Sequence, residues 1–189
     1  MDNIDVEYAK EKGIKVINTP AASSHSVAEL VFAHLYGLAR YLHNANRDMP
    51  LEGDSKFKDL KKAYAKGTEL KGKTIGILGF GRIGQATAKV AIGAGMNVIA
   101  YDPFIQEANL ELNFFDGQKL SFNIKTISKE SVLKQSDFIT LHVPAQKDYV
   151  IGSKEFELMK DGVIIANAAR GGVIDEIALI NSICRKKFI

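Results

Sequence analysis

The strongest constraint on the fold of this chain is a set of glycines that follows an apolar run. Residues 74–78 are apolar enough to form a buried strand, and residues 97–101 form a second such run that ends at Asp102. Between the two runs, glycines recur with the spacing G-x-G-x-x-G, namely Gly79, Gly81 and Gly84. A strand, a glycine turn, a helix and a second strand that ends in an acid form the βαβ unit that binds dinucleotides.

Each residue of this unit has a separate physical task. Gly79 allows the tight turn, Gly81 lets the backbone approach a pyrophosphate, and Gly84 lets the helix pack against the strand. The pyrophosphate then lies at a helix N-terminus, where free N–H groups and the helix dipole favour negative charge. The Asp102 carboxylate can accept hydrogen bonds from both ribose hydroxyls and would repel a 2′-phosphate, so NAD is favoured over NADP. The alternative is a domain whose glycines only form a tight turn.

The pattern after residue 73 predicts an α/β fold with a doubly wound, mostly parallel sheet. Apolar strands alternate with helical patterns, the strands at 74–78, 97–101, 138–143 and 163–166 and the later helices at 128–134, 153–160 and 175–186. Buried strands that alternate with helices form a parallel sheet covered on both faces. Asp116-Gly117 lies between two β-rich runs after Asp102, and it predicts an inserted β-hairpin at the sheet edge.

The first residues predict a short helix at 5–12 and a strand at 14–17, followed by a loop at 21–26. Ser26 and Glu29 then form a capping-box pattern, which places the start of a long helix at Ser26. One face of this helix carries apolar side chains at positions 27, 30, 31, 35, 38 and 42.

The long helix is followed by a polar stretch. Residues 47–69 are rich in lysine and contain Pro50 and Gly53. We therefore expect a surface excursion with a short helix near 58–65.

A second candidate site follows the strand at 163–166. Ligands of open α/β sheets bind outside the carboxyl ends of the strands, and Arg170 lies four residues beyond this strand. Arg170 is therefore placed to bind a substrate carboxylate through two hydrogen bonds. The alternative is a surface arginine that pairs with Asp175 or Glu176.

His142 ends another predicted strand, and several roles are open to it. It could be an acid or base, a contact to the cofactor, or a buried imidazole hydrogen-bonded to the backbone. The chain has four histidines, and no spacing among them suits a metal site, so no metal is expected.

Composition excludes few classes of protein but narrows the setting. The net charge of +3 comes from 25 basic and 22 acidic residues, which is too balanced to indicate nucleic-acid binding. Cys184 is the single cysteine, so no internal disulfide can form and a reducing compartment is expected. No run of about 18 apolar residues could span a membrane. We therefore expect a cytoplasmic protein of one domain, or of one domain with part of another.

Together with the glycine turn, five segments resemble the D-isomer-specific 2-hydroxyacid dehydrogenases. These segments are 26–30, 70–74, 101–103, 141–144 and 168–176. The resemblance covers nearly the whole chain and implies a protein of two similar α/β domains. Residues 1–22 would be a remnant of the substrate domain, and residues 23–189 would be the NAD-binding domain, truncated at its C-terminal end.

The resemblance also implies roles for residues. Arg82 and Ile83 would contact the pyrophosphate, and Arg170 would hold the substrate carboxylate during catalysis. The residues that line the adenosine or nicotinamide side would be Val143, Pro144, Ala168 and Ala169. The implied partner is a second copy of the chain, packed through the helix from Val27 and the excursion up to about Lys66.

The implied reaction is reversible hydride transfer between NAD and a D-2-hydroxy acid, most similar to the oxidation of 3-phosphoglycerate in serine biosynthesis. Relatives that reduce glyoxylate, hydroxypyruvate or pyruvate share these motifs, and some act as NAD-sensing corepressors, a binding function. A methyltransferase would also use a glycine turn and an acid, but the segments at 141–144 and around Arg170 disfavour it.

Three departures from the family pattern affect these expectations, and one of them is that the hairpin after Asp102 is longer than usual. The family usually has an asparagine before the long helix, where this chain has Ser23-Ser24-His25. The family's catalytic histidine and its partner glutamate would lie beyond Ile189, and His142 does not match that histidine. We therefore expect a fragment that is inactive by itself.

Overall fold

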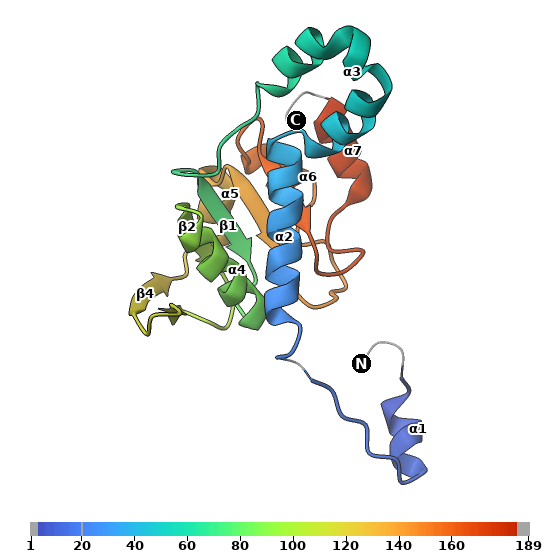
Figure 1. The fold of residues 1–189 in the computed structure, drawn as a ribbon. Coiled ribbons are helices and arrows are strands. Elements are labelled where there is room, and N and C mark those ends of the chain that lie inside the picture. The colour runs from blue at the N-terminus through green and yellow to red at the C-terminus, as the bar shows by residue number, and fades with distance from the viewer. Residues whose placement is uncertain (1–3, 20, 185–189) are drawn as a thin grey trace.

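The computed structural model describes residues 4–19 and 21–184. A four-stranded sheet forms its centre, in the order β2-β1-β5-β6, and each neighbouring pair is parallel. The strands are β1 (Thr74–Leu78), β2 (Asn97–Tyr101), β5 (Phe138–Leu141) and β6 (Ile164–Asn167). The predicted α/β fold with a mostly parallel sheet is confirmed (Figure 1).

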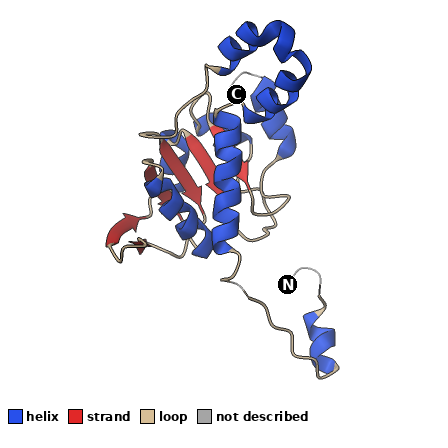
Figure 2. Cartoon of the chain, viewed as in Figure 1, coloured by secondary structure: helices blue, strands red, loops and turns tan. Residues whose placement is uncertain are grey.

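Helices cover both faces of this sheet (Figure 2). One face packs against α2 (Ser24–Ala39) and α4 (Arg82–Gly93). The other packs against α5 (Lys129–Gln135), α6 (Ser153–Leu158) and α7 (Glu176–Cys184).

The alternation of side chains along β1 separates the two cores. Ile75 and Ile77 point into the core shared with α2 and α4, whereas Leu78 belongs to the core shared with α5, α6 and α7. All three side chains are essentially unexposed. Each contributes about 1.5–3 kcal/mol to folding through burial, so β1 is the strand around which both cores form.

The predicted hairpin is confirmed between β2 and α5. β3 (Glu107–Asn113) and β4 (Lys119–Lys125) pair antiparallel, and Gly117 in the turn has φ +86°, a left-handed conformation that favours glycine. Leu110 and Phe122 pack against the core beside α4. The hairpin is a separate two-stranded sheet, joined to the edge strand β2 by a bridge between Ala100 and Thr126.

The long helix α2 begins earlier than its sequence pattern predicts. It starts at Ser24, so the predicted cap at Ser26 is wrong, and residues 24–26 are helical rather than a loop. The predicted apolar face is also partly wrong, because Leu30 and Leu38 are 50% and 51% exposed. The stripe that packs against α4 and β6 consists of Ala28, Val31, Phe32, Leu35 and Ala39. Small alanines at both ends of this stripe allow the close packing that the larger exposed leucines would prevent.

The predicted surface excursion and its short helix near 58–65 are confirmed, but the irregular stretch predicted before that helix is wrong, because α3 (Leu42–Tyr64) is helical over 23 residues. It bends at Lys56, where the backbone leaves the helical region. Local side-chain pairs support it, including the ion pair between Glu52 and Lys56 four residues apart. None of its residues is buried, so packing within this chain does not explain it.

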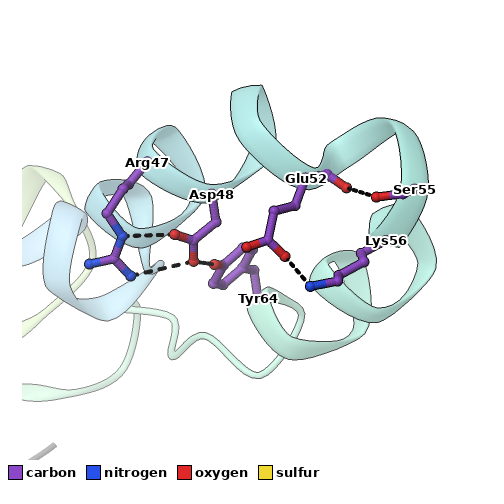
Figure 3. Close-up of polar contacts among 6 residues, drawn as sticks. All are labelled: Arg47, Asp48, Glu52, Ser55, Lys56 and Tyr64. Atoms are coloured by element: carbon purple, nitrogen blue, oxygen red, sulfur yellow. Dashed lines mark hydrogen bonds and ion pairs between the residues drawn. The ribbon is translucent and has the colours of Figure 1, made fainter.

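One polar cluster links the two halves of α3 across the bend (Figure 3). The Tyr64 hydroxyl donates to the Asp48 carboxylate, which also accepts from Arg47 at 2.7 Å. These hydrogen bonds, from Arg47 first and then Tyr64, lower the pKa of Asp48 below its ordinary value. The cluster therefore holds the bent helix as a hairpin of two helical arms.

The N-terminal segment confirms one prediction and contradicts another. α1 (Val6–Glu11) lies where a helix was predicted, and the Asp5 carboxylate accepts from Tyr8 N–H at 2.9 Å. Residues 14–17 have no regular structure, so the predicted strand is wrong. A strand needs a partner, and Figure 1 shows this segment leading away from the sheet. Within residues 4–19 and 21–184, no helix is long and apolar enough to cross a membrane.

Candidate functional site

The register of the sheet brings the carboxyl ends of the four strands to one edge. Leu78 pairs with Tyr101 on one side and Leu141 on the other, and Leu141 pairs with Asn167. The residues that follow these ends therefore lie in a row, in the order Asp102, Gly79, His142 and Ala168. Along the chain, β1 is followed by β2 on one side, and the chain then returns to place β5 on the other side of β1. Open α/β sheets bind their ligands where the strand order reverses in this way.

The glycine turn after β1 is compact for two steric reasons. Gly79 has φ +92°, and a Cβ there would lie 2.5 Å from the His142 carbonyl oxygen. A Cβ at Gly84 would collide with the Gly79 carbonyl oxygen, so α4 could not approach β1 as closely. Gly81 differs, because a Cβ there would meet no described atom within 4 Å. The space beside Gly81 is open, as a bound pyrophosphate would require.

The start of α4 offers backbone donors to that space. Gly81 is the N-cap residue, and no side chain among the described residues caps this end. The first intrahelical bond runs from Gln85 N–H to Gly81 C=O at 2.9 Å, which leaves the N–H groups of Arg82, Ile83 and Gly84 for a ligand. The residues present therefore fit a dinucleotide pyrophosphate.

Asp102 lies half-buried beside this turn and is already hydrogen-bonded. One carboxylate oxygen accepts from Phe80 N–H at 2.7 Å, and the other accepts from Phe104 N–H at 2.8 Å and Ile105 N–H at 3.1 Å. The carboxylate is thus fixed between the glycine turn and the end of β2. A ribose placed here would meet an oriented acceptor rather than a mobile side chain.

The segment after β5 carries Val143 and Pro144 at the same edge. Its far end is anchored by Lys129, which donates to Val150 C=O at 3.1 Å and to Glu155 at 2.8 Å. Partial burial by itself would raise the pKa of Glu155, but the hydrogen bonds from Lys129 and Gly152 outweigh it and lower that pKa. This ion pair was not foreseen from the sequence, since its partners are 26 residues apart.

The turn after β6 is shaped by Asn167, which the sequence reasoning did not single out. Its side-chain amide donates to Arg170 C=O at 3.0 Å, and its carbonyl oxygen accepts from Ala169 N–H at 3.0 Å. The turn therefore presents Ala168 and Ala169 half-buried and Arg170 exposed. Arg170 Nη1 donates to Ala169 C=O at 2.8 Å. An asparagine at the last position of a strand is the signal that could have identified this clamp.

His142 is a half-buried imidazole whose partners are threonine hydroxyls rather than the predicted backbone. Burial lowers its pKa from 6.5 to about 4, so the ring is neutral near pH 7. A general base acts best with a pKa near the working pH, which argues against His142 in that role. Among the described residues, the edge formed by the carboxyl ends of the strands thus offers N–H groups that can bind an anion, the oriented Asp102 carboxylate and the exposed Arg170.

A parallel α/β sheet with this glycine turn and this acid defines a dinucleotide-binding domain. The model of the D-isomer specific 2-hydroxyacid dehydrogenase NAD binding domain matches residues 32–188. The chain therefore belongs to the D-isomer specific 2-hydroxyacid dehydrogenase family, and the cofactor of that family is NAD.

Individual relatives agree with this assignment but differ in substrate. The chain is 45% identical to a hydroxypyruvate reductase of Thermotoga maritima, over 99% of this chain and 56% of that protein. It is 42% identical to a D-3-phosphoglycerate dehydrogenase of Methanocaldococcus jannaschii, over 97% of this chain and 33% of that protein. A solved D-2-hydroxyisocaproate dehydrogenase superposes with a TM-score of 0.80 at 33% identity, over 100% of this chain and 53% of that one. The chain thus spans between a third and about half of the relatives it matches.

Proposed function

We propose that the protein containing this chain is an oxidoreductase that transfers a hydride between NAD and a D-2-hydroxy acid. The supporting observation is the row of groups at the carboxyl edge of the sheet. Open space at Gly81, the oriented Asp102 carboxylate and the turn that carries Arg170 follow strand ends held in register. NAD supplies the hydride chemistry when bound, and the chain binds and orients it.

Each part of this edge would have its own task in the proposed reaction. The turn from Gly79 to Gly84, including Arg82 and Ile83, would bind the pyrophosphate, and Asp102 would bind the adenosine ribose. Val143, Pro144, Ala168 and Ala169 would line the cofactor. Arg170 would bind the substrate carboxylate and orient the reacting carbon toward the nicotinamide.

For the substrate, we propose 3-phosphoglycerate, oxidised to 3-phosphohydroxypyruvate in serine biosynthesis. Similarity to D-3-phosphoglycerate dehydrogenases over nearly the whole chain supports this choice. A specific observation favours a second candidate, reduction of hydroxypyruvate, because a hydroxypyruvate reductase is 45% identical to the chain. A glyoxylate reductase of Thermococcus litoralis, 41% identical, supports glyoxylate as a third substrate to assay.

We further propose that residues 1–22 belong to a substrate domain and residues 23–189 to the NAD-binding domain. The course of residues 4–19 away from the sheet supports this division (Figure 1). For the partner, we propose a second copy of the chain, packed through α2 and α3 in the cytoplasm. The support is α3 itself, a helix of 23 residues with none buried and with exposed apolar side chains.

The proposed function is tested in two steps. NADH is first titrated into the 189-residue chain and followed by fluorescence, and saturable binding is expected. The complete gene product is then assayed with 3-phosphoglycerate and NAD, and with hydroxypyruvate or glyoxylate and NADH. The substrate with the highest kcat/KM identifies the enzyme. Absence of turnover with all three, despite NADH binding, would contradict the proposed reaction.

A further inference from the structure

The imidazole of His142 bridges β5 and α4. Its Nε2 lies 3.2 Å from Thr87 Oγ1 and 3.1 Å from Thr140 Oγ1, and both threonines are completely buried. The Thr87 hydroxyl donates to the carbonyl oxygen of Ile83 at 2.9 Å. A continuous set of hydrogen bonds thus leads from His142 through Thr87 to Ile83, in the turn whose N–H groups face the pyrophosphate space.

The hydrogen-bonding capacity of Thr87 fixes the tautomer of this histidine. A hydroxyl has one proton, and that of Thr87 is used toward Ile83, so its oxygen can only accept from the imidazole. For the contact between Nε2 and Thr87 to be a hydrogen bond, Nε2 must carry the proton. Nδ1 is buried and has no hydrogen-bond partner among the described residues, so a second proton there would remain unsatisfied.

We propose that His142 is a positioning residue for the cofactor, which as its neutral Nε2–H tautomer fixes Thr87 and thereby the first turn of α4 against the pyrophosphate. This inference rests on the proposed NAD site at the glycine turn. The backbone of His142 contributes to the same arrangement, because its N–H donates to Leu78 C=O at 2.7 Å and its own carbonyl oxygen packs against Gly79. Both the side chain and the backbone of one residue therefore set the position of the turn.

Variants at this position separate positioning from folding. His142→Gln places an amide N–H near the position of Nε2, whereas His142→Leu removes the donor and keeps an apolar side chain. We expect NADH affinity to fall about five- to tenfold in His142→Leu, the loss typical of one net hydrogen bond, and to recover largely in His142→Gln. Affinity for adenosine, which lacks a pyrophosphate, should stay unchanged in both variants. Gln118→Leu, at an exposed position in the hairpin turn, is the control.

A second variant tests the route through Thr87. Thr87→Val removes the hydroxyl at nearly constant volume and should weaken NADH binding by a similar factor. In the double variant with His142→Leu, the two losses should not add, because both remove the same contact. Additive losses would overturn the proposed route.

A measurement on the unaltered chain decides the tautomer even where a variant fails to fold. A long-range ¹H–¹⁵N NMR spectrum near pH 7 should show His142 protonated at Nε2 alone. The inference would be overturned by a charged ring or by an Nδ1–H tautomer in this spectrum. It would also be overturned if His142→Leu bound NADH as tightly as the parent, or lost NADH and adenosine binding equally. Failure of the unaltered chain to bind NADH would instead contradict the proposed cofactor site, so the two failures are distinguishable.

Discussion

At the Asp102 carboxylate, three backbone N–H groups occupy most of the acceptor positions that a carboxylate offers. The negative charge is therefore held rigidly where an adenosine ribose would bind, and it would repel a 2′-phosphate there. Asp102→Asn removes the charge and keeps one oxygen acceptor, which can serve Phe104 and Ile105, while its amide NH2 can no longer accept from Phe80 N–H. We expect the preference for NADH over NADPH to narrow by about tenfold or more, the loss typical of a charge-assisted hydrogen bond.

Fluorescence titration of both cofactors measures this ratio. Asp116→Asn is the matched control, since Asp116 also accepts from a backbone N–H but lies in the hairpin turn. An unchanged ratio in Asp102→Asn would mean that the ribose binds elsewhere.

His142 gives the stability of the chain a pH dependence of definite sign. Because burial lowers its pKa from 6.5 to about 4, the unfolded chain binds this proton more readily than the folded chain. Its contribution to the free energy of unfolding is complete above pH 6.5 and is lost as the pH falls from 6.5 toward 4. The loss in that free energy is about 2 kcal/mol near pH 5. Urea unfolding of the parent and of His142→Gln near pH 7 and pH 5 should show this loss in the parent alone. The same loss in both proteins would assign it to other groups.

At the scale of elements, the approach of α4 to β1 depends on one glycine. Gly84→Ala would place a Cβ against the Gly79 carbonyl oxygen, so the helix must move outward. We expect a loss of about 1–3 kcal/mol in the free energy of unfolding, together with weaker NADH binding.

Gly93→Ala in the same helix is the control for Gly84→Ala. A Cβ at Gly93 meets no described atom within 4 Å, so this variant should be neutral or more stable by up to about 1 kcal/mol. Thermal and urea unfolding of the two variants compare a buried and an open position in one element. Equal stability of the two would show that α4 adjusts without cost.

The elements differ in how far the sequence could predict them. The strands around Gly79 were predictable because apolar runs, glycine spacing and Asp102 all specify the same local structure. The strand at 14–17 and the cap at Ser26 were wrong because strand pairing and helix starts depend on neighbours that a local pattern does not contain. The second arm of α3 was predicted near 58–65, but the first arm was missed because its support includes a contact between Asp48 and Tyr64, 16 residues apart.

The residues of the candidate site also differ in whether the sequence could predict them. The glycine turn and Asp102 follow from spacing, whereas the clamp at Asn167 and the contact between His142 and Thr87 join atoms that only the folded chain brings together. The last of these joins residues 55 positions apart in the sequence.

At the scale of the whole molecule, the unburied apolar side chains of α3 predict self-association. Leu42, Leu51 and Phe57 are 63%, 76% and 51% exposed. Analytical ultracentrifugation should show a dimer at tens of micromolar, a rough range for an interface of standard size. Leu51→Glu should shift the chain to monomer, whereas Phe115→Glu, a similar change on the hairpin tip, should not. A monomeric parent, or dimers in both variants, would place the interface elsewhere.

The segment that carries α3 leaves and re-enters the domain at neighbouring points. Thr68 N–H donates to Ala39 C=O at 2.8 Å, and a Cβ at Gly67 would press on that same oxygen, so the closure is tight. The two ends of the long segment that contains α3 are therefore joined by a direct backbone hydrogen bond. A change in the length of the chain between Ala39 and Thr68 would therefore leave both ends of this closure in place, and all four strands of the parallel sheet lie outside it.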